Sequence, residues 1–90
     1  MPTAHYEVIG TVQGVGFRWF VRVAARRLQI AGWVMNRRDG SVEIAAEGPS
    51  DKLDELRRLI ERGPDGAVVT EVRDLEPLSE ALESPFAMKK

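Results

Sequence analysis

The residues best suited to chemistry in this chain are two glycines and an arginine in the segment VQGVGFR, residues 12–18. Gly14 and Gly16 let the main chain turn through conformations that other residues rarely adopt, so that consecutive amides can converge on one anion. If the segment leads from a strand into a helix, the first helical amides also lack partners and favour negative charge. Arg18 would add a planar guanidinium that pairs well with phosphate. The pattern therefore indicates an anion site that suits a phosphate group.

A simpler interpretation fits the same spacing. The QGVG segment can be only a tight connection between a strand and a helix, with Arg18 in solvent, since short glycine motifs are weak signals. However, an arginine in a first helical turn is unfavourable to the helix dipole, because both are positive, and a bound anion would remove that conflict. The unfavourable position of Arg18 relative to the helix dipole favours a functional role for this arginine. The spacing alone leaves both interpretations open.

The flanking patterns predict the elements that would hold this turn. Residues 6–12, YEVIGTV, are rich in β-branched types and predict a strand. Residues 32–38 and 41–47 predict two more strands, because they flank Asp39-Gly40, a strong hairpin signal. The apolar residues after the glycine turn recur at helical spacing and predict an amphipathic helix: Phe17, Phe20, Val21, Ala24, Ala25 and Leu28.

The second half of the chain continues with a helix and one or two strands. The helix is expected from about Asp51 to Arg62, capped by Ser50 and ended by the GPDG run. Its core positions have helical spacing: Leu53, Leu56 and Ile60. Residues 67–75 predict a fourth strand, and a fifth is expected at Phe86, in a weakly patterned segment that contains two prolines.

The order of these elements predicts the fold class. A βαββαβ order with right-handed crossovers, and a possible C-terminal edge strand, gives an α+β fold with two helices on one face of an antiparallel sheet. This arrangement is the ferredoxin-like α/β plait. We expect residues 1–90 to form one domain, since the length suits a single core and no linker divides the chain.

Composition excludes several other kinds of site. The chain has no cysteine, so a disulfide, a thiolate metal site and a cysteine nucleophile are all excluded. The single histidine, His5, is expected at the surface and cannot build a multi-histidine zinc site or a convincing catalytic triad. The start lacks the pattern of a signal peptide, and no apolar run approaches the roughly 20 residues that span a bilayer. We therefore expect a cytoplasmic protein.

Several motifs taken together resemble the acylphosphatase family. The family signature VQGVxFR, GxVxN and DGxVE appears in order as VQGVGFR, GWVMN and DGSVE, followed by GP and AVVTEV. The resemblance covers roughly residues 6–72. It implies the same plait and the hydrolysis of acyl phosphates, which are carboxyl-phosphate anhydrides, to a carboxylate and inorganic phosphate. It also implies that no metal or organic cofactor takes part.

The resemblance assigns roles to individual residues. Arg18 would bind the phosphoryl oxygens, and Asn36 would orient the attacking water. Apart from the resemblance, Trp19, which directly follows Arg18, is expected to line the rim of the site or to pack locally. Five residues would supply main-chain amides to the phosphate: Gln13, Gly14, Val15, Gly16 and Phe17. Such a site needs no general acid, because the leaving carboxylate has a pKa near 4 and gains little from protonation.

The chain departs from the family pattern after its first helix. The family commonly has a glycine before a leucine there, whereas this chain has Gln29 and Ile30. A residue other than glycine is expected to be strained in a left-handed helix cap. Elsewhere, we expect Trp33 to pack on a sheet face. Arg37 and Arg38 are expected to be solvated beside the hairpin turn, where either could attract an anionic substrate.

Two other functions compete with hydrolysis. A non-catalytic module could use the same glycine turn to sense a phosphorylated metabolite or partner, although binding alone needs no Asn36. An RNA-binding plait would display aromatic residues on its central strands, where this sequence offers only Tyr6. The net charge of -1 also gives no general attraction to nucleic acid. The expected partners are therefore a small acyl phosphate as substrate and inorganic phosphate as product. We expect the protein to be a monomer that binds neither nucleic acid nor membrane.

Overall fold

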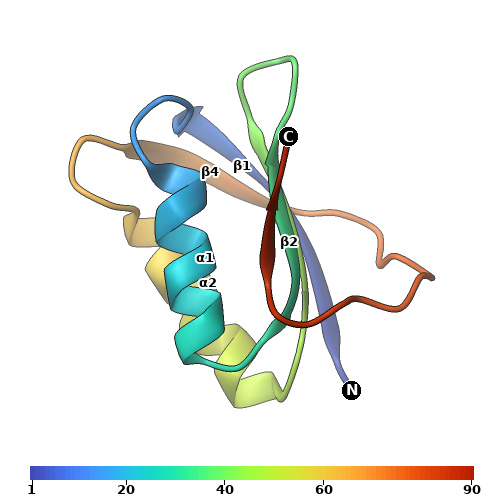
Figure 1. Ribbon diagram of the computed structural model, residues 1–90. Helices are drawn as coiled ribbons and strands as arrows, with labels where there is room; N and C mark the ends of the chain where they lie inside the picture. Colours follow the sequence, from blue (N-terminus) through green and yellow to red (C-terminus); the bar gives the residue numbers. More distant parts are fainter.

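The computed structural model describes residues 1–90 and contains one five-stranded sheet with two helices on the same face (Figure 1). Along the chain the elements are β1 (Thr3–Thr11), α1 (Phe17–Arg27), β2 (Ala31–Asn36), β3 (Val42–Glu47), α2 (Ser50–Arg62), β4 (Val68–Asp74) and β5 (Ala87–Lys89). The strands lie in the order β4-β1-β3-β2-β5. The glycine turn therefore leads from a central strand into the first helix.

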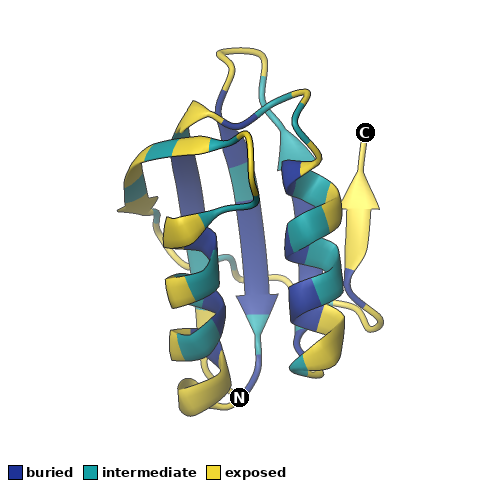
Figure 2. Cartoon of the chain, turned by 90° about the vertical axis from the view of Figure 1, so that its left-hand side faces the viewer, coloured by how far each residue is buried: buried dark blue, intermediate teal, exposed yellow.

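The core lies between the helices and the sheet (Figure 2). Alternate residues of β1 and β3 face it, including Val8, Val42 and Ile44, each fully buried. The helices bury one side each, because their apolar residues recur every three or four positions. The buried helix residues are Phe17, Val21, Ala24 and Ala25 from α1, and Leu53, Leu56 and Ile60 from α2.

The predicted ferredoxin-like plait is confirmed, and the expected fifth strand is present. Strands β1 to β4 pair antiparallel, whereas β5 pairs with β2 in parallel, so the complete sheet is mixed. The strand begins one residue after Phe86, whose side chain is fully buried. No helix of the chain has the length and apolar character that crossing a membrane requires.

The start of α2 differs from the prediction. Pro49, rather than Ser50, occupies the N-cap position, and no side chain caps the helix by a hydrogen bond. Pro49 has an extended backbone conformation (φ -60°, ψ 147°), and its carbonyl accepts from the amides of Lys52 and Leu53. The predicted serine cap was therefore wrong, because Ser50 already belongs to the helix.

The end of α1 is a left-handed cap that glycine usually occupies. The amide of Ile30 donates to the Ala25 carbonyl at 2.9 Å, and the amide of Gln29 donates to the Arg26 carbonyl at 3.1 Å. This pair of bonds defines a Schellman motif. Gln29 is its left-handed residue, with φ 58°, and no other residue except glycine has a positive φ in this chain. The strain expected from the sequence therefore lies at Gln29.

We predict that Gln29→Gly stabilises the protein. A left-handed conformation costs a residue with a Cβ atom roughly 1–2 kcal/mol, and the greater freedom of glycine in the unfolded chain returns about half of that. The expected gain in the free energy of unfolding is therefore up to about 1 kcal/mol. Urea denaturation of both proteins would measure it, with Arg27→Gly as a control that should be destabilising. A loss of stability in Gln29→Gly would contradict the strain.

Candidate active site

The turn between β1 and α1 is fixed at both ends and open in the middle. Val12 and Phe17, which flank it, are each only 1% exposed and belong to the core. Gly14 and Gly16 are exposed between them, and both have φ 77°, in the left-handed region. This conformation favours glycine. The buried flanking residues therefore hold a short stretch of main chain at the surface in an unusual shape.

The amides of this turn are free to bind. The first amide of the region that donates to a main-chain carbonyl is that of Phe20, which bonds to Gly16 at 3.0 Å. The amides from Gly14 to Trp19 have no such acceptor, and no side chain caps α1. A Cβ atom added at Gly14 or Gly16 would meet nothing within 4 Å. The free donors therefore lie beside open space, where a helix N-terminus favours an anion.

A pocket of about 150 Å³ brings together several of the residues singled out in the sequence. Its lining residues are Val12, Gly14, Gly16, Phe17, Arg18, Trp19, Asn36 and Met88. The remaining two members of the predicted amide set, Gln13 and Val15, belong to the same turn but do not line the pocket. The pocket thus joins the glycine turn, the first turn of α1, the end of β2 and β5.

The two polar side chains of the pocket differ in how they are held. Arg18 Nη1 donates to the main-chain carbonyl of Lys89 in β5 at 2.9 Å. This contact occupies one of the five guanidinium donors and leaves others for a ligand. Asn36 Oδ1 is buried and has no hydrogen-bond partner. A buried polar atom without a partner is uncommon. The pocket therefore offers spare donors, and Asn36, one of its lining residues, carries an acceptor atom without a partner.

The side chain of Gln13 connects the turn to the neighbouring hairpin. Its Nε2 donates to the carbonyls of Arg37 at 2.7 Å and Ser41 at 2.9 Å. Arg37 directly follows Asn36, so these bonds set the glycine turn against the strand end that carries Asn36. The sequence suggested only a main-chain role for Gln13, because nothing in a local pattern shows a contact with residues 24 and 28 positions away.

The hairpin turn is stabilised by charged and polar groups. The Ser41 hydroxyl donates to Asp39 at 2.6 Å, and this bond, with a second from the Ser41 amide, lowers the pKa of the Asp39 carboxyl. Arg37 Nη1 lies 3.6 Å from an oxygen of Glu7, a largely buried residue of β1. Arg37 is thus partly exposed beside Glu7, and Arg38 is exposed as expected.

His5 was expected at the surface ahead of the first strand, and this prediction was wrong. It belongs to β1, and its side chain is only 10% exposed. Its Nε2 lies 2.6 Å from a Glu43 oxygen, and its Nδ1 lies 2.7 Å from the Glu76 carbonyl. Trp33 packs against it edge-on, with ring centroids 6.3 Å apart, so the predicted packing role of Trp33 is confirmed. These groups do not line the pocket of Arg18.

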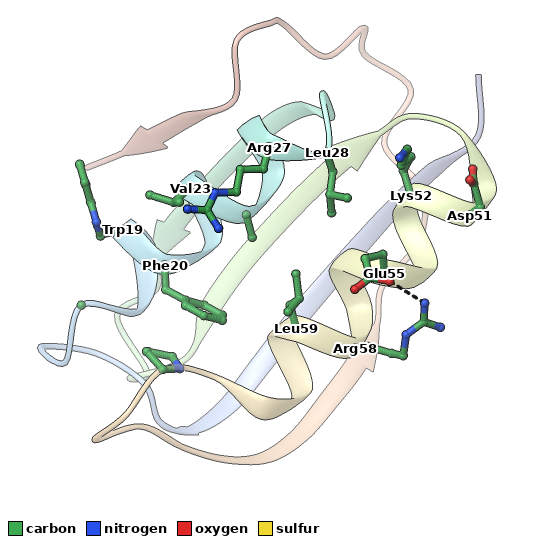
Figure 3. Close-up of a pocket in the computed structure, with 13 residues that line it drawn as sticks. Trp19, Phe20, Val23, Arg27, Leu28, Asp51, Lys52, Glu55, Arg58 and Leu59 are labelled. Atoms are coloured by element: carbon green, nitrogen blue, oxygen red, sulfur yellow. Dashed lines mark hydrogen bonds and ion pairs between the residues drawn. The ribbon is translucent and has the colours of Figure 1, made fainter.

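A larger hollow, about 780 Å³, lies elsewhere, along the groove between α1 and α2 (Figure 3). Phe20 and Leu59 point into it from the two helices, and the Glu55–Arg58 ion pair lies along one side. It shares only Gly16 and Trp19 with the small pocket. The free amides, Arg18 and Asn36 thus gather in the smaller space, which is the candidate active site.

A ferredoxin-like plait that exposes free amides and an arginine at its first strand-to-helix turn defines a class of small proteins whose site suits an anionic group. The acylphosphatase family model matches residues 4–88. An acylphosphatase from Koribacter versatilis is 52% identical over 77 residues, covering 83% of this chain and 70% of that protein. One from Acidiphilium cryptum is 41% identical over 90 residues, covering 100% of this chain and 97% of that protein.

A solved structure is similar over its whole length. The crystal structure of an acylphosphatase from Bacillus subtilis superposes with a TM-score of 0.90 at 40% sequence identity, covering 100% of both chains. The chain therefore belongs to the acylphosphatase family. The resemblance found in the sequence motifs is confirmed, and so is the prediction that the chain is a hydrolase of that family.

Proposed function

We propose that the chain hydrolyses the carboxyl-phosphate bond of small acyl phosphates in the pocket of the glycine turn. The main-chain amides from Gln13 to Phe17 and the guanidinium of Arg18 hold the phosphoryl oxygens. Asn36 accepts a hydrogen bond from the attacking water and directs its lone pair toward phosphorus. No metal or organic cofactor takes part.

One observation carries this proposal. The same small pocket is lined by Arg18 and by residues whose amides are free, and also by Asn36, whose Oδ1 is buried without a partner. A phosphoryl group needs the donors and a nucleophilic water needs the acceptor. A module that only bound phosphate would use the donors and would leave the Asn36 acceptor without a role.

The chemistry requires positioning rather than acid or base catalysis. Water forms a bond to phosphorus while the bond from phosphorus to the acyl oxygen breaks, and the carboxylate leaves with the electron pair. The leaving group has a pKa near 4 and needs no proton. The proton of the water passes to an oxygen of the phosphate, because the Asn36 amide cannot accept it at neutral pH. The amides and Arg18 stabilise the charge on the equatorial oxygens.

The direct test is an assay of acetyl phosphate and benzoyl phosphate hydrolysis in the presence of EDTA. Turnover to inorganic phosphate under these conditions supports a metal-independent hydrolase. Binding of inorganic phosphate without any turnover would instead favour the phosphate-sensing module. Loss of turnover in EDTA that magnesium restores would reject the metal-free mechanism.

We predict that Arg18→Ala weakens phosphate binding and turnover together. By analogy with the loss of an oxyanion donor, kcat/KM should fall by an amount equivalent to about 3–4 kcal/mol of transition-state stabilisation. Steady-state kinetics with inorganic phosphate as inhibitor would measure both effects. Arg38→Ala is the matched control, because this exposed arginine lies outside the pocket. An equal loss in both variants would indicate general attraction by positive charge rather than a role for Arg18.

We predict a different result for Asn36→Ala. Because Asn36 would contact the water and not the phosphate, kcat should fall by about 100-fold or more, as for other lost transition-state contacts. The inhibition constant of inorganic phosphate should change little. A parallel loss of phosphate affinity would show that Asn36 is a binding residue instead.

Two further expectations from the sequence remain predictions. A monomer would be checked by light scattering of the purified chain. The cytoplasmic location would be checked by fractionation of cells that express it.

A further inference from the structure

Two exposed apolar side chains lie at the opening of the candidate active site. The large apolar residues that remain exposed in this chain are Met1, Trp19, Val68 and Met88. Trp19 is 59% exposed and Met88 is 40% exposed, and both line the pocket that contains Arg18 and Asn36. The other apolar residues of that pocket, Val12 and Phe17, are buried in the core. The exposed apolar surface among the residues that line this pocket is therefore supplied by Trp19 and Met88.

Trp19 is held in a defined orientation although it is exposed. It is the third residue of α1 and directly follows Arg18. The guanidinium carbon of Arg22, one helical turn further on, lies 4.8 Å from the centroid of its ring. A cation over an aromatic ring is attracted by the electrons of its face. Arg22 thus covers part of the indole and restricts its rotation beside the pocket.

Met88 is held by the attachment of β5 to α1. Arg26 Nε donates to the Phe86 carbonyl at 2.8 Å, and Arg18 Nη1 donates to the Lys89 carbonyl at 2.9 Å. These two bonds fix β5 on either side of Met88. Met88 is also the register partner of Val34, which is fully buried. Partners in register point to the same face of a sheet, so Met88 points to the helix-bearing side, where α1 begins.

We propose that Trp19 and Met88 form the acyl subsite and that the preferred substrates are acyl phosphates with an apolar, especially aromatic, acyl group. This inference rests on the proposed function. In an acyl phosphate the carbonyl carbon is joined to phosphorus through a single oxygen, so the acyl group must lie within a few ångströms of the phosphate. When the phosphate lies against the glycine turn, the acyl group of the bound substrate extends out of the small pocket between the side chains of Trp19 and Met88.

The chemistry of both residues suits such a group. An indole offers a flat face on which an aromatic ring can stack, and methionine is flexible and polarizable, so it adapts to rings and branched chains. When an apolar acyl group lies between Trp19 and Met88, apolar surface of the substrate and of the two side chains is removed from water. Acetyl phosphate carries only one methyl group and would gain much less from this contact than benzoyl phosphate.

The test compares benzoyl phosphate with acetyl phosphate in four proteins: the wild type, Trp19→Ala, Met88→Ala and Val68→Ala. The wild type should prefer benzoyl phosphate in kcat/KM. In Trp19→Ala this preference should fall by about tenfold, in the range of lost apolar substrate contacts, chiefly through KM. Met88→Ala should reduce the preference by a smaller factor. The inhibition constant of inorganic phosphate should not move, since the phosphate contacts remain.

Val68→Ala is the control, because Val68 is 57% exposed on β4 and does not line the pocket. Its substrate preference should equal that of the wild type. A normal wild-type rate with an unchanged preference in both Trp19→Ala and Met88→Ala would overturn the acyl subsite alone. Failure of the wild type to hydrolyse either substrate would overturn the proposed function and the acyl subsite with it.

Discussion

The site depends on a main-chain turn that the core holds at both ends. Val12 and Phe17 are buried, and the four residues between them must connect a strand to a helix through two left-handed glycines. In the proposed phosphate site, the amides left unpaired by this shape supply most of the hydrogen-bond donors. Because the flanking side chains pack in the core, the turn has little freedom to close on itself. The packing of Val12 and Phe17 in the core thus determines where the amide donors of the turn lie.

Much of the fold could be predicted from the sequence, because the apolar residues of both helices and the Asp39-Gly40 hairpin are local signals. The glycine turn was also visible, since its residues are adjacent in the chain. The contacts that complete the pocket were not. Lys89 meets Arg18 across 71 positions, and the residue before it, Met88, lies in a segment with weak periodicity. Such contacts depend on where the fifth strand pairs, which a local pattern does not specify.

The correction at His5 has the same origin. The partners of His5, Glu43 and the Glu76 carbonyl, come from segments far from it in the sequence, so no local pattern shows the contacts that bury its side chain. Arg37 likewise meets Glu7 only because β1 and β3 are paired and the hairpin reaches beyond them. By contrast, the left-handed conformation at Gln29 was correctly expected, because the family commonly has a glycine at this position.

The bond between Arg18 and the Lys89 carbonyl has a consequence for affinity. A long arginine side chain on a surface samples many rotamers, and ordering it on ligand binding would cost roughly 0.5–1.5 kcal/mol. Here the carbonyl already restricts the side chain in the free protein. The side-chain entropy of Arg18 is therefore lost when β5 folds onto the sheet. In the proposed site, an anion would bind a guanidinium whose rotamers are already restricted.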